Sequence, residues 1–579
     1  MTHRSKLNRR QFLQGLGVGS TALLVVACAQ PTPAAKAPEP TKSPAAQAPA
    51  ATKAPEPTKA AEPTKAPAAT KAPEPTKAPA PAGGSTLTYW VGMNQNVGAT
   101  LKSFGEMTCY KELEKATGVK IEFQHPPIGQ EAEQFNLLVA SGKFPDIIEH
   151  YWTGAPGGPA KYLRDGVIVK LNDLIDKQAP NLKKIFAEHA DWRRQILTDE
   201  GDVYGFPFFR SDPFLMVFQG PIIRKDWLDK VGMQMPVTMD DWYAVLKAFK
   251  EKDPNGNGKA DEFAFSPMLY GQPLNAFQGA GAFVGAYGVT YGFYQVKGVV
   301  KYGPLEPAFK DFLKTMAQWY KDGLVDPDFP TMDQKLMDAK VTGNQLGSFV
   351  QNTGGGIGKY QGLMKEKDPK FQLVAAPYPV LKKGDKPIFG QRDFNFNGLS
   401  ASITTANKKV ADSIKVLDYG YGPEGHMLFN FGVAGLTYNL VNGYPKYTDL
   451  ITNNPNKLPL QQSMGQHFRS NFAGPMVQDK RYMEQYAALP EQQDSLKIWS
   501  EPSNEYQMPL VTPTQDESKK FASVMTEVNT RCQEAVTKII TGQQPVDGWD
   551  AVVKELKGMG IEDAIKIQQA ALERFNKRP

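Results

Sequence analysis

The residues from 253 to 262 place oxygen-bearing groups on alternate positions of a short polar loop. Calcium takes six to eight hard oxygen ligands, and a tight loop can direct every second residue toward one ion. The spacing therefore predicts a structural calcium site. Lys259 would bind the ion through its backbone carbonyl. Four residues would bind it through their side chains: Asp253, Asn255, Asn257 and Asp261.

The end of this loop departs from the EF-hand pattern. Counted from Asp253, Gly258 occupies the sixth position, where an EF-hand loop needs glycine. The twelfth position is Ala264 instead of glutamate, and Glu262 at the tenth position is the candidate bidentate substitute. The competing interpretation is an Asn-Gly turn that binds no ion. Because five oxygen-bearing positions in register exceed what a turn requires, we favour calcium, with Glu262 as a further ligand.

A helix must precede the loop and position it. Thr238 and Asp241 have nearly the spacing of a capping box, which marks a helix start. Apolar residues then recur at positions i, i+3, i+4 and i+7, which is one face of an amphipathic helix: Trp242, Val245, Leu246 and Phe249. We expect this helix to end at Lys252 and its apolar face to belong to the core.

Several further motifs carry a family resemblance. The stretch from Ile223 to Glu262, which includes this helix and loop, contains IRKDWLDKVG, P-x-T-x-x-x-W and KDPNGNGKADE in succession. Elsewhere the chain contains LLVASGKFPDII at 137–148, GVIVKLNDLID at 166–176, GDVYGFPFF at 201–209 and DYGYGPEGHMLFNFGVAGLTY at 418–438. Together they resemble the LplA-type extracellular solute-binding proteins of family 1, which are carbohydrate-binding lipoproteins of ABC importers similar to alginate-oligosaccharide-binding proteins. The resemblance covers nearly all of 85–579.

This resemblance implies an α/β fold with two lobes, of the type II periplasmic-binding-protein class, with crossing segments between the lobes and a helix-rich C-terminal part. It places 85–212 and 350–397 in an N-terminal lobe. It places 213–349 and 398–579 in a C-terminal lobe. The sequence itself supports an α/β layer, because strand-like stretches at 87–91, 119–124 and 146–150 alternate with helical ones. Residues 85–579, called the body below, number 495. This exceeds the roughly 250–300 residues at which a single hydrophobic core stops growing, so at least two domains are expected.

The first 28 residues resemble a twin-arginine-type lipoprotein signal. Arg9 and Arg10 precede an apolar run from Phe12 to Ala27, which is shorter than the roughly 20 residues of a membrane span. The run ends in VVAC, which resembles a lipobox, so we expect Cys28 to become the lipid-modified N-terminus. An uncleaved N-terminal anchor is the alternative. Either places the body at the outer face of the cytoplasmic membrane.

Residues 29–84 form a low-complexity segment rich in Pro, Ala, Lys and Thr. KAPEPTK occurs three times, and the segment has no aromatic or branched aliphatic residue. Such a composition cannot bury enough apolar surface to offset its ordering entropy, so we expect a disordered tether. The first 84 residues carry a net charge of about +7, which leaves the body near −1 and gives no electrostatic indication of nucleic-acid binding.

No known catalytic constellation is evident in the sequence. The six histidines are isolated, and neither HExxH nor GxSxG occurs. The glycine run at 354–358 lacks the flanking residues of a phosphate-binding loop, so it either brings backbone close to a ligand or forms a turn. Carboxylates are too numerous for a catalytic pair to be argued from sequence. Cys109 and Cys532 could form a disulfide in an exported protein. Two separate free thiols are the alternative, and they do not require the two residues to lie close together.

A carbohydrate site needs aromatic faces together with planar hydrogen-bonding groups. Three aromatic-polar clusters, at 150–152, 208–212 and 391–397, fall at expected strand ends or crossings between lobes. For each aromatic residue alone, core packing is the competing role. From these clusters and the VAGLTY run we predict seven ligand-binding residues: Tyr151, Trp152, Phe209, Arg210, Arg392, Asn395 and Tyr438.

The sequence thus favours a monomeric, membrane-tethered substrate-binding protein that captures a carbohydrate, in particular an oligosaccharide, and delivers it to ABC permease subunits without bond chemistry. One alternative is an extracellular polysaccharide lyase or hydrolase, which turnover of a glycan would reveal. The other is a ligand-sensing lipoprotein that signals through a partner, which a partner pull-down would distinguish from transport.

The lipobox interpretation predicts that Cys28→Ser releases the protein from the membrane. Without the thiol no lipid can be attached, and the apolar run alone is too short to span a bilayer. Membrane and soluble fractions of cells producing each form would be compared by immunoblot. A variant that is cleaved elsewhere and stays fully membrane-bound would contradict the anchor assignment.

Overall fold

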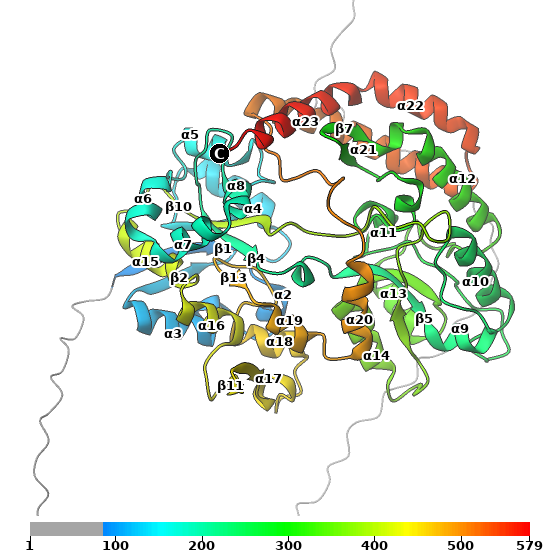
Figure 1. Ribbon diagram of the computed structural model, residues 1–579, viewed down its shortest axis with the longest axis horizontal. Coiled ribbons are helices and arrows are strands. Elements are labelled where there is room, and N and C mark those ends of the chain that lie inside the picture. The colour runs from blue at the N-terminus through cyan, green and yellow to red at the C-terminus, as the bar shows by residue number, and fades with distance from the viewer. Residues whose placement is uncertain (1–84) are drawn as a thin grey trace, which may run out of the picture. The chain divides into compact units, whose positions relative to one another are not determined.

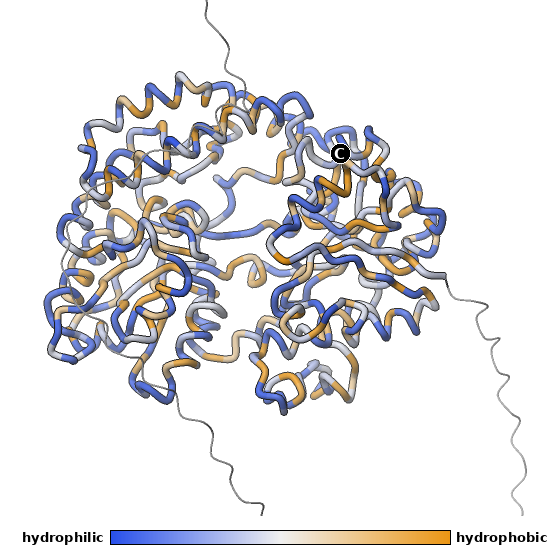
Figure 2. Tube along the Cα trace, turned by 180° about the vertical axis from the view of Figure 1, so that it is seen from behind, coloured by the Kyte–Doolittle hydropathy of each residue, from blue (hydrophilic) through white to orange (hydrophobic). Residues whose placement is uncertain are grey.

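The computed structural model describes residues 85–579, so the expected signal, tether and Cys28 lie outside the described residues. Two main β-sheets surrounded by helices make up this part of the chain (Figure 1). Apolar residues concentrate on the strands and on the inward faces of the helices (Figure 2). No helix within 85–579 combines the length and the apolar character that crossing a membrane requires.

The first sheet has six strands in the order β13-β4-β10-β3-β1-β2. Strand β1 lies between β2 and β3 and is parallel to both, whereas β10 runs antiparallel between β3 and β4. The register pairs Trp90 with Ile148 and Ser400 with His150. The strands are β1 (Thr86–Val91), β2 (Lys120–Gln124), β3 (Ile147–Tyr151), β4 (Phe206–Arg210), β10 (Phe396–Ile403) and β13 (Val477–Gln478).

The helices packed around this sheet complete the first lobe. Their apolar faces and the strands share one hydrophobic core, which includes Leu87, Ile147, Phe206 and Ile403, each fully buried. These helices are α2 (Gln95–Gly98), α3 (Thr108–Thr117), α4 (Glu131–Ser141), α5 (Gly158–Arg164), α6 (Asn172–Gln178), α7 (Pro180–Glu188), α8 (Ala190–Ile196), α15 (Val410–Tyr419) and α16 (Pro423–Phe431).

The second lobe is built on a three-stranded antiparallel sheet in the order β8-β5-β9, with a separate β6–β7 hairpin. Its strands are β5 (Gln219–Arg224), β6 (Phe293–Val296), β7 (Val299–Tyr302), β8 (Ser348–Asn352) and β9 (Leu373–Ala375). Its helices are α9 (Lys225–Val231), α10 (Met239–Glu251), α11 (Asn275–Gln278), α12 (Pro307–Lys321), α13 (Gln334–Thr342), α14 (Lys359–Met364), α20 (Pro490–Trp499), α21 (Gln515–Ile540), α22 (Trp549–Gly558) and α23 (Ile561–Asn576).

The strand pairing corrects the expected lobe boundaries. Residues 350–397 were assigned to the first lobe, but β8 and β9 pair with β5 in the second. Residues 398–579 were assigned to the second lobe, but most of β10 lies within them and is hydrogen-bonded to β3 and β4 in the first sheet. The core explains the difference, because Val350 and Leu373 pack with the second lobe whereas Ala401 and Ile403 pack with the first.

A small satellite cluster extends from the first lobe. It contains a two-stranded hairpin, β11 (Tyr438–Val441) and β12 (Tyr444–Tyr447), and the helices α17 (Asp449–Thr452), α18 (Leu460–Gly465) and α19 (Lys480–Tyr486). Phe431, Met464 and Phe468 form its buried centre. In Figure 1 the cluster lies at the lower edge of the first lobe, beside α16.

Helix α10 forms as its sequence predicts. The Thr238 hydroxyl accepts a hydrogen bond from the Asp241 amide, and the Asp241 carboxylate accepts one from the Thr238 amide, which completes a capping box. The apolar face is buried, with Trp242 fully enclosed and its ring 5.0 Å from that of Phe283. Lys252 follows the last helical residue and leads into the acidic loop.

The two cysteines of the body are free thiols in separate cores. Cys109 is buried in the first lobe and Cys532 in the second, so the open question of a disulfide is resolved against pairing. Burial raises the pKa of each thiol to about 12. Neither thiol is therefore ionised near neutral pH, and both act as small apolar core residues.

The enclosure of Trp242 predicts that Trp242→Ala lowers the free energy of unfolding by about 3–5 kcal/mol, because the change leaves a large cavity in the second lobe. Urea denaturation would measure the shift. The neighbouring Tyr243, which is partly exposed, gives a matched control: Tyr243→Ala should cost much less. Equal losses for the two variants would contradict the core assignment.

Candidate ligand cleft and acidic loop

A cavity of about 300 Å³ lies between the two lobes. Strands β3, β4 and β13 of the first sheet and β8 of the second direct their carboxyl ends toward it, and β10 begins beside it. Ligands of open α/β sheets gather beyond the carboxyl ends of strands. The lining residues are Tyr151, Phe208, Arg210, Leu215, Phe218, Asn352, Thr353, Gly354, Gly355, Asn397, Asn471, Phe472, Ala473, Gln478, Tyr482, Met483 and Tyr486.

Aromatic rings make up much of the cavity wall. Three tyrosines and three phenylalanines line it, and Tyr482 and Tyr486 come from successive turns of α19 with ring centroids 5.8 Å apart. The Tyr151 ring is about half exposed. Burial raises the pKa of Tyr151 and of Tyr486, so both phenols keep their protons at neutral pH. Such rings offer flat apolar faces with a hydroxyl at the edge.

Arg210 is the cation in this wall. Its guanidinium lies 5.4 Å from the ring centre of Phe208 and 6.0 Å from that of Phe218. Nη1 lies 2.9 Å from a carboxylate oxygen of Asp393, which is only partly exposed. Burial raises the pKa of Asp393, and the nearby Arg210 charge opposes part of that rise. The pair therefore places a positive group at the cavity with its counter-charge behind it.

The glycine run begins a helix at the cavity instead of a phosphate-binding loop. Strand β8 leads directly into a π-helical turn, Thr353–Gly358, that continues as α14. A side chain at Gly354 would lie 2.5 Å from the Tyr486 hydroxyl oxygen, and one at Gly356 would lie 2.6 Å from Ile222. A side chain at Gly355 would have no atom within 4 Å of its Cβ, and this residue lines the cavity. Glycine is thus required for close packing at two positions.

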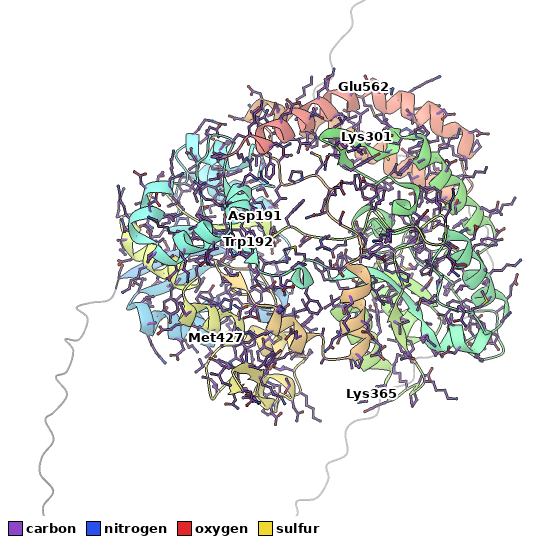
Figure 3. The ribbon with its side chains drawn as sticks, in the orientation of Figure 1. Asp191, Trp192, Lys301, Lys365, Met427 and Glu562 are labelled. Atoms are coloured by element: carbon purple, nitrogen blue, oxygen red, sulfur yellow. The ribbon has the colours of Figure 1, made fainter. Side chains whose placement is uncertain are left out.

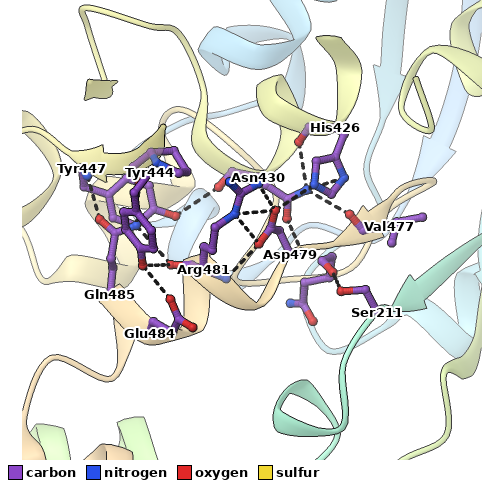
Figure 4. Close-up of polar contacts among 12 residues, drawn as sticks. Ser211, His426, Asn430, Tyr444, Tyr447, Val477, Asp479, Arg481, Glu484 and Gln485 are labelled. Atoms are coloured by element: carbon purple, nitrogen blue, oxygen red, sulfur yellow. Dashed lines mark hydrogen bonds and ion pairs between the residues drawn. The ribbon is translucent and has the colours of Figure 1, made fainter. Parts of the chain in front are cut away.

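Helix α19 is fixed by a polar network around Asp479, the N-cap residue that precedes it (Figure 4). The Asp479 carboxylate accepts hydrogen bonds from the Arg481 guanidinium, and one of its oxygens lies 2.9 Å from His426 Nε2. Asn430 accepts a hydrogen bond from the Asp479 amide. Burial alone would raise the pKa of Asp479, but these partners hold it well below its ordinary range. The network sets the direction in which α19 presents Tyr482 and Tyr486.

The structure separates the predicted ligand-binding residues into several groups. Tyr151 and Arg210 line the cavity. Asn395 lies next to it, where its side chain donates to the Arg210 carbonyl and its own carbonyl accepts from the Arg210 amide, both at 2.8 Å. Arg392 donates to the carbonyls of Ser500 and Pro502 and does not line the cavity.

Three of the predicted residues do not line this cavity. Trp152 and Phe209 are fully buried and pack in the core of the first lobe. Trp152 follows its strand, as expected, but its ring turns inward and its Nε1 donates to the Ser400 carbonyl at 3.0 Å. Phe209 alternates with the cavity residues Phe208 and Arg210 on β4 and occupies the opposite face. Tyr438 is buried in the satellite cluster.

A second cavity, of about 380 Å³, is larger but has a different character. It is lined by α8, the β6–β7 hairpin, α23 and the segments at 394–395 and 504–510. Asp191, which Figure 3 labels on α8, and the other charged residues of its wall are exposed. Only two aromatic rings, Phe394 and Phe575, face it. We therefore take the cavity at the strand ends as the candidate ligand site.

The loop at 253–262 is held by its own side chains. Asp253 accepts hydrogen bonds from the amides of Gly256, Asn257 and Gly258. Asp261 accepts from the side chains of Asn255, Asn257 and Gln345, whose hydrogen bonds lower its pKa although burial opposes them. Within 85–579, no three His, Cys, Asp or Glu side chains converge as a metal site requires.

The side chain of Glu262 is a buried carboxylate at the end of this loop. The residue is only 1% exposed, and neither oxygen of its carboxylate has a hydrogen-bond partner within the described chain. Burial raises its pKa, and the charges of Asp253 and Asp261 add to the rise. A buried carboxylate without a partner is costly, and a cation is one way to compensate it. The amide nitrogens of Asn255 and Asn257 both face Asp261, so rotation of these amides would turn their oxygens toward that carboxylate and a cation bound there.

Sequence reasoning missed most of the aromatic wall. Tyr482 and Tyr486 stand at i and i+4 of a helix, a spacing that also fits ordinary core packing. Phe218 and Phe472 lie in irregular segments without a periodic signal. Asn352 was within reach of prediction, because it ends a recognisable strand next to the glycine run. Gln478 follows only two residues of strand, too short to recognise from sequence.

Comparison with known proteins places these features in a family. The profile described as "Bacterial extracellular solute-binding protein" matches residues 95–427, which is more than half of the chain. The fructooligosaccharide ABC transporter substrate-binding protein FusA of Streptococcus pneumoniae serotype 4 (strain ATCC BAA-334 / TIGR4) is 28% identical over 497 residues, covering 82% of this chain and 88% of that protein.

Two further relatives agree with this match. Lipoprotein LipO of Bacillus subtilis (strain 168) is 31% identical over 370 residues, covering 62% of this chain and 68% of LipO. The crystal structure of the alginate-binding protein AlgQ2 without calcium ion superimposes with a TM-score of 0.66 and 27% identity. That superposition covers 84% of this chain and 98% of AlgQ2.

Proposed function

Because the chain belongs to the bacterial extracellular solute-binding protein family, we propose that it captures an oligosaccharide between its two lobes and delivers it to the permease of an ABC importer. The cavity at the strand ends carries this proposal, since it combines six aromatic rings with amide side chains and one guanidinium. The known ligands of relatives point the same way: FusA is named for fructooligosaccharide and AlgQ2 for alginate.

The lining suits recognition of sugar rings. Aromatic faces cover the apolar C–H surface of a pyranose or furanose, and each Å² removed from water contributes roughly 25 cal/mol. The side chains of Asn352, Asn397 and Asn471 can form hydrogen bonds with the hydroxyls of a sugar. None of the residues that line this cavity in the described chain is Asp, Glu or His. The lining therefore supports binding without bond cleavage.

Ligand binding would couple to closure of the lobes, because both lobes contribute to the wall. Tyr151 and Arg210 belong to the first sheet, whereas Asn352 and Gly355 belong to the second lobe. A ligand that contacts both groups binds the closed arrangement more tightly than an open one, and this difference in affinity drives closure. The crossing segments at 211–218 and 376–395 would absorb the movement.

The export and anchoring features complete the proposal. A twin-arginine-type signal would export the protein, lipid on Cys28 would hold it at the outer face of the cytoplasmic membrane, and the tether at 29–84 would let the body reach the permease. LipO, which is named as a lipoprotein, supports this arrangement.

We predict that Tyr151→Ala weakens oligosaccharide binding roughly tenfold, about 1.4 kcal/mol, by removing a half-exposed ring from the cavity wall. The melting temperature should change little, because the ring is not enclosed by core. Isothermal titration with an oligosaccharide found by thermal-shift screening would measure the affinity, and Tyr243→Ala on α10 is a control outside the cavity. Wild-type affinity in Tyr151→Ala would contradict this location of the site.

We also propose that the loop at 253–262 binds structural Ca²⁺. Asp253, Asn255, Asn257, Asp261 and Glu262 would hold the ion through side chains and Lys259 through its carbonyl. The unpartnered Glu262 carboxylate supports this proposal, as does an all-oxygen donor set of the kind calcium prefers. The bound ion would supply positive charge to the buried carboxylate and would fix the loop that follows α10.

Removal of calcium should lower the melting temperature. An ion that binds only the folded state stabilises it by mass action, by about 2.7 kcal/mol at 100 times its Kd. Melting curves with Ca²⁺ or EDTA should therefore differ for the wild type. The double variant Asp253→Ala with Asp261→Ala should give one curve in both conditions, whereas Asp173→Asn, exposed on α6, should respond like the wild type. Identical wild-type curves, together with no metal by elemental analysis, would refute the site.

A further inference from the structure

The charge of the cavity wall rests on a single side chain. Arg210 is the only Lys, Arg, Asp, Glu or His among the residues that line the cavity in the described chain. Its guanidinium lies near the rings of both Phe208 and Phe218, which limits its movement. The side chain is only 14% exposed, so its charge is screened less than that of a surface arginine.

Asp393 neutralises this charge from outside the cavity. Its carboxylate lies 2.9 Å from Arg210 Nη1, and it does not line the cavity. Gln391 donates to one of its oxygens, and its own amide donates to the Met216 carbonyl, so its position is fixed on two sides. The contact with Arg210 is ionic, because Nη1 has no hydrogen-bond partner within 85–579.

The pair therefore leaves donors but little net charge. Nη1 is buried and faces Asp393, whereas the other N–H groups of the guanidinium remain able to donate to a ligand. The attraction of Arg210 for a second carboxylate is offset, because any such group would also be repelled by Asp393 a few ångströms behind the arginine. A sugar hydroxyl gains the hydrogen bond without that repulsion.

Two amides beside the cavity also suit hydroxyls. Gln478 Nε2 donates to the Ser470 carbonyl, and Asn471 Nδ2 donates to the Gln461 carbonyl. Because a carbonyl can only accept, these nitrogens must face it, and the amide oxygens must point elsewhere. Both oxygens are buried and have no hydrogen-bond partner in the described chain. The groups left over at these two residues are therefore acceptors, which suit a donor such as a hydroxyl and not a carboxylate, although both oxygens are enclosed in this arrangement of the wall.

From this arrangement we propose that Asp393 makes the cavity selective for uncharged oligosaccharides over those that contain uronic acids, by neutralising Arg210. Asp393 acts through Arg210 and is a positioning and charge-compensating residue, not one that touches the ligand. The inference rests on the proposed carbohydrate-binding function and specifies the class of sugar.

Removal of the carboxylate should reverse part of this selectivity. Asp393→Asn keeps the shape of the side chain and an oxygen that can accept from Gln391, but it leaves the charge of Arg210 unopposed. A uronate carboxylate should therefore gain affinity at least tenfold in the variant, whereas a neutral sugar should change less.

The test uses the exported protein without its signal and two sets of trisaccharides: neutral ones, including kestose and maltotriose, and acidic ones, including trigalacturonate and trimannuronate. Methyl-esterified trigalacturonate keeps the rings and removes the charge. Affinities would be measured by titration calorimetry at two salt concentrations, for the wild type, Asp393→Asn and Arg210→Gln with Asp393→Asn. Asp173→Asn, which changes the net charge equally at an exposed site, is the control.

The proposal is supported if the wild type prefers neutral trisaccharides, if Asp393→Asn alone gains a salt-sensitive affinity for the acidic ones, and if the added Arg210→Gln change removes that gain. If the wild type prefers acidic trisaccharides, the selectivity proposal is overturned, but the proposed carbohydrate-binding function is not. An unchanged ratio of acidic to neutral affinity in a folded Asp393→Asn variant also overturns it. Binding of neither set by any form overturns the proposed function and this inference together.

Discussion

A buried ion pair between Glu149 and Arg469 joins the first sheet to the chain that forms the cavity wall. Arg469 contacts both carboxylate oxygens of Glu149, at 2.6 and 3.0 Å, and both side chains are almost fully enclosed. Burial alone would lower the pKa of Arg469, but Glu149 raises it overall. Loss of one partner would leave an uncompensated buried charge, which typically costs about 3–5 kcal/mol. The segment from Asn471 to Ala473, which lines the cavity, follows directly from this anchor.

The remaining walls depend on similar fixed points. The Asp479 network orients α19 and its two tyrosines. The paired hydrogen bonds of Arg210 with Asn395 join the end of β4 to the residue that precedes β10. The glycines at 354 and 356 let β8 and its helix approach their neighbours closely enough to close the other side. Each wall is therefore positioned by interactions outside the cavity, so the lining side chains are not needed to hold the backbone and can contact the ligand.

Local features could be predicted from sequence, whereas long-range pairings could not. The helix at 239–251, its capping box and the strand at 147–151, which was expected at 146–150, each follow from short-range spacing. The side chain of Trp152 follows its strand as expected, but which way the ring turns depends on the antiparallel neighbour β10, whose place in the first sheet no local signal reveals. The same strand explains the misplaced lobe boundary. Most of the aromatic wall comes from α19 and irregular segments, which distant contacts bring to the cavity.

The central claim is that a carbohydrate binds between the lobes, against the ends of β3, β4 and β8. A crystal structure of the protein with an oligosaccharide that it binds in solution tests this most directly. We expect a sugar ring in the cavity beside Tyr151, with a hydroxyl hydrogen-bonded to Arg210 and another group close to the backbone at Gly355. A sugar bound instead beside Asp191 in the second cavity, with the cavity at the strand ends left empty, would contradict the account.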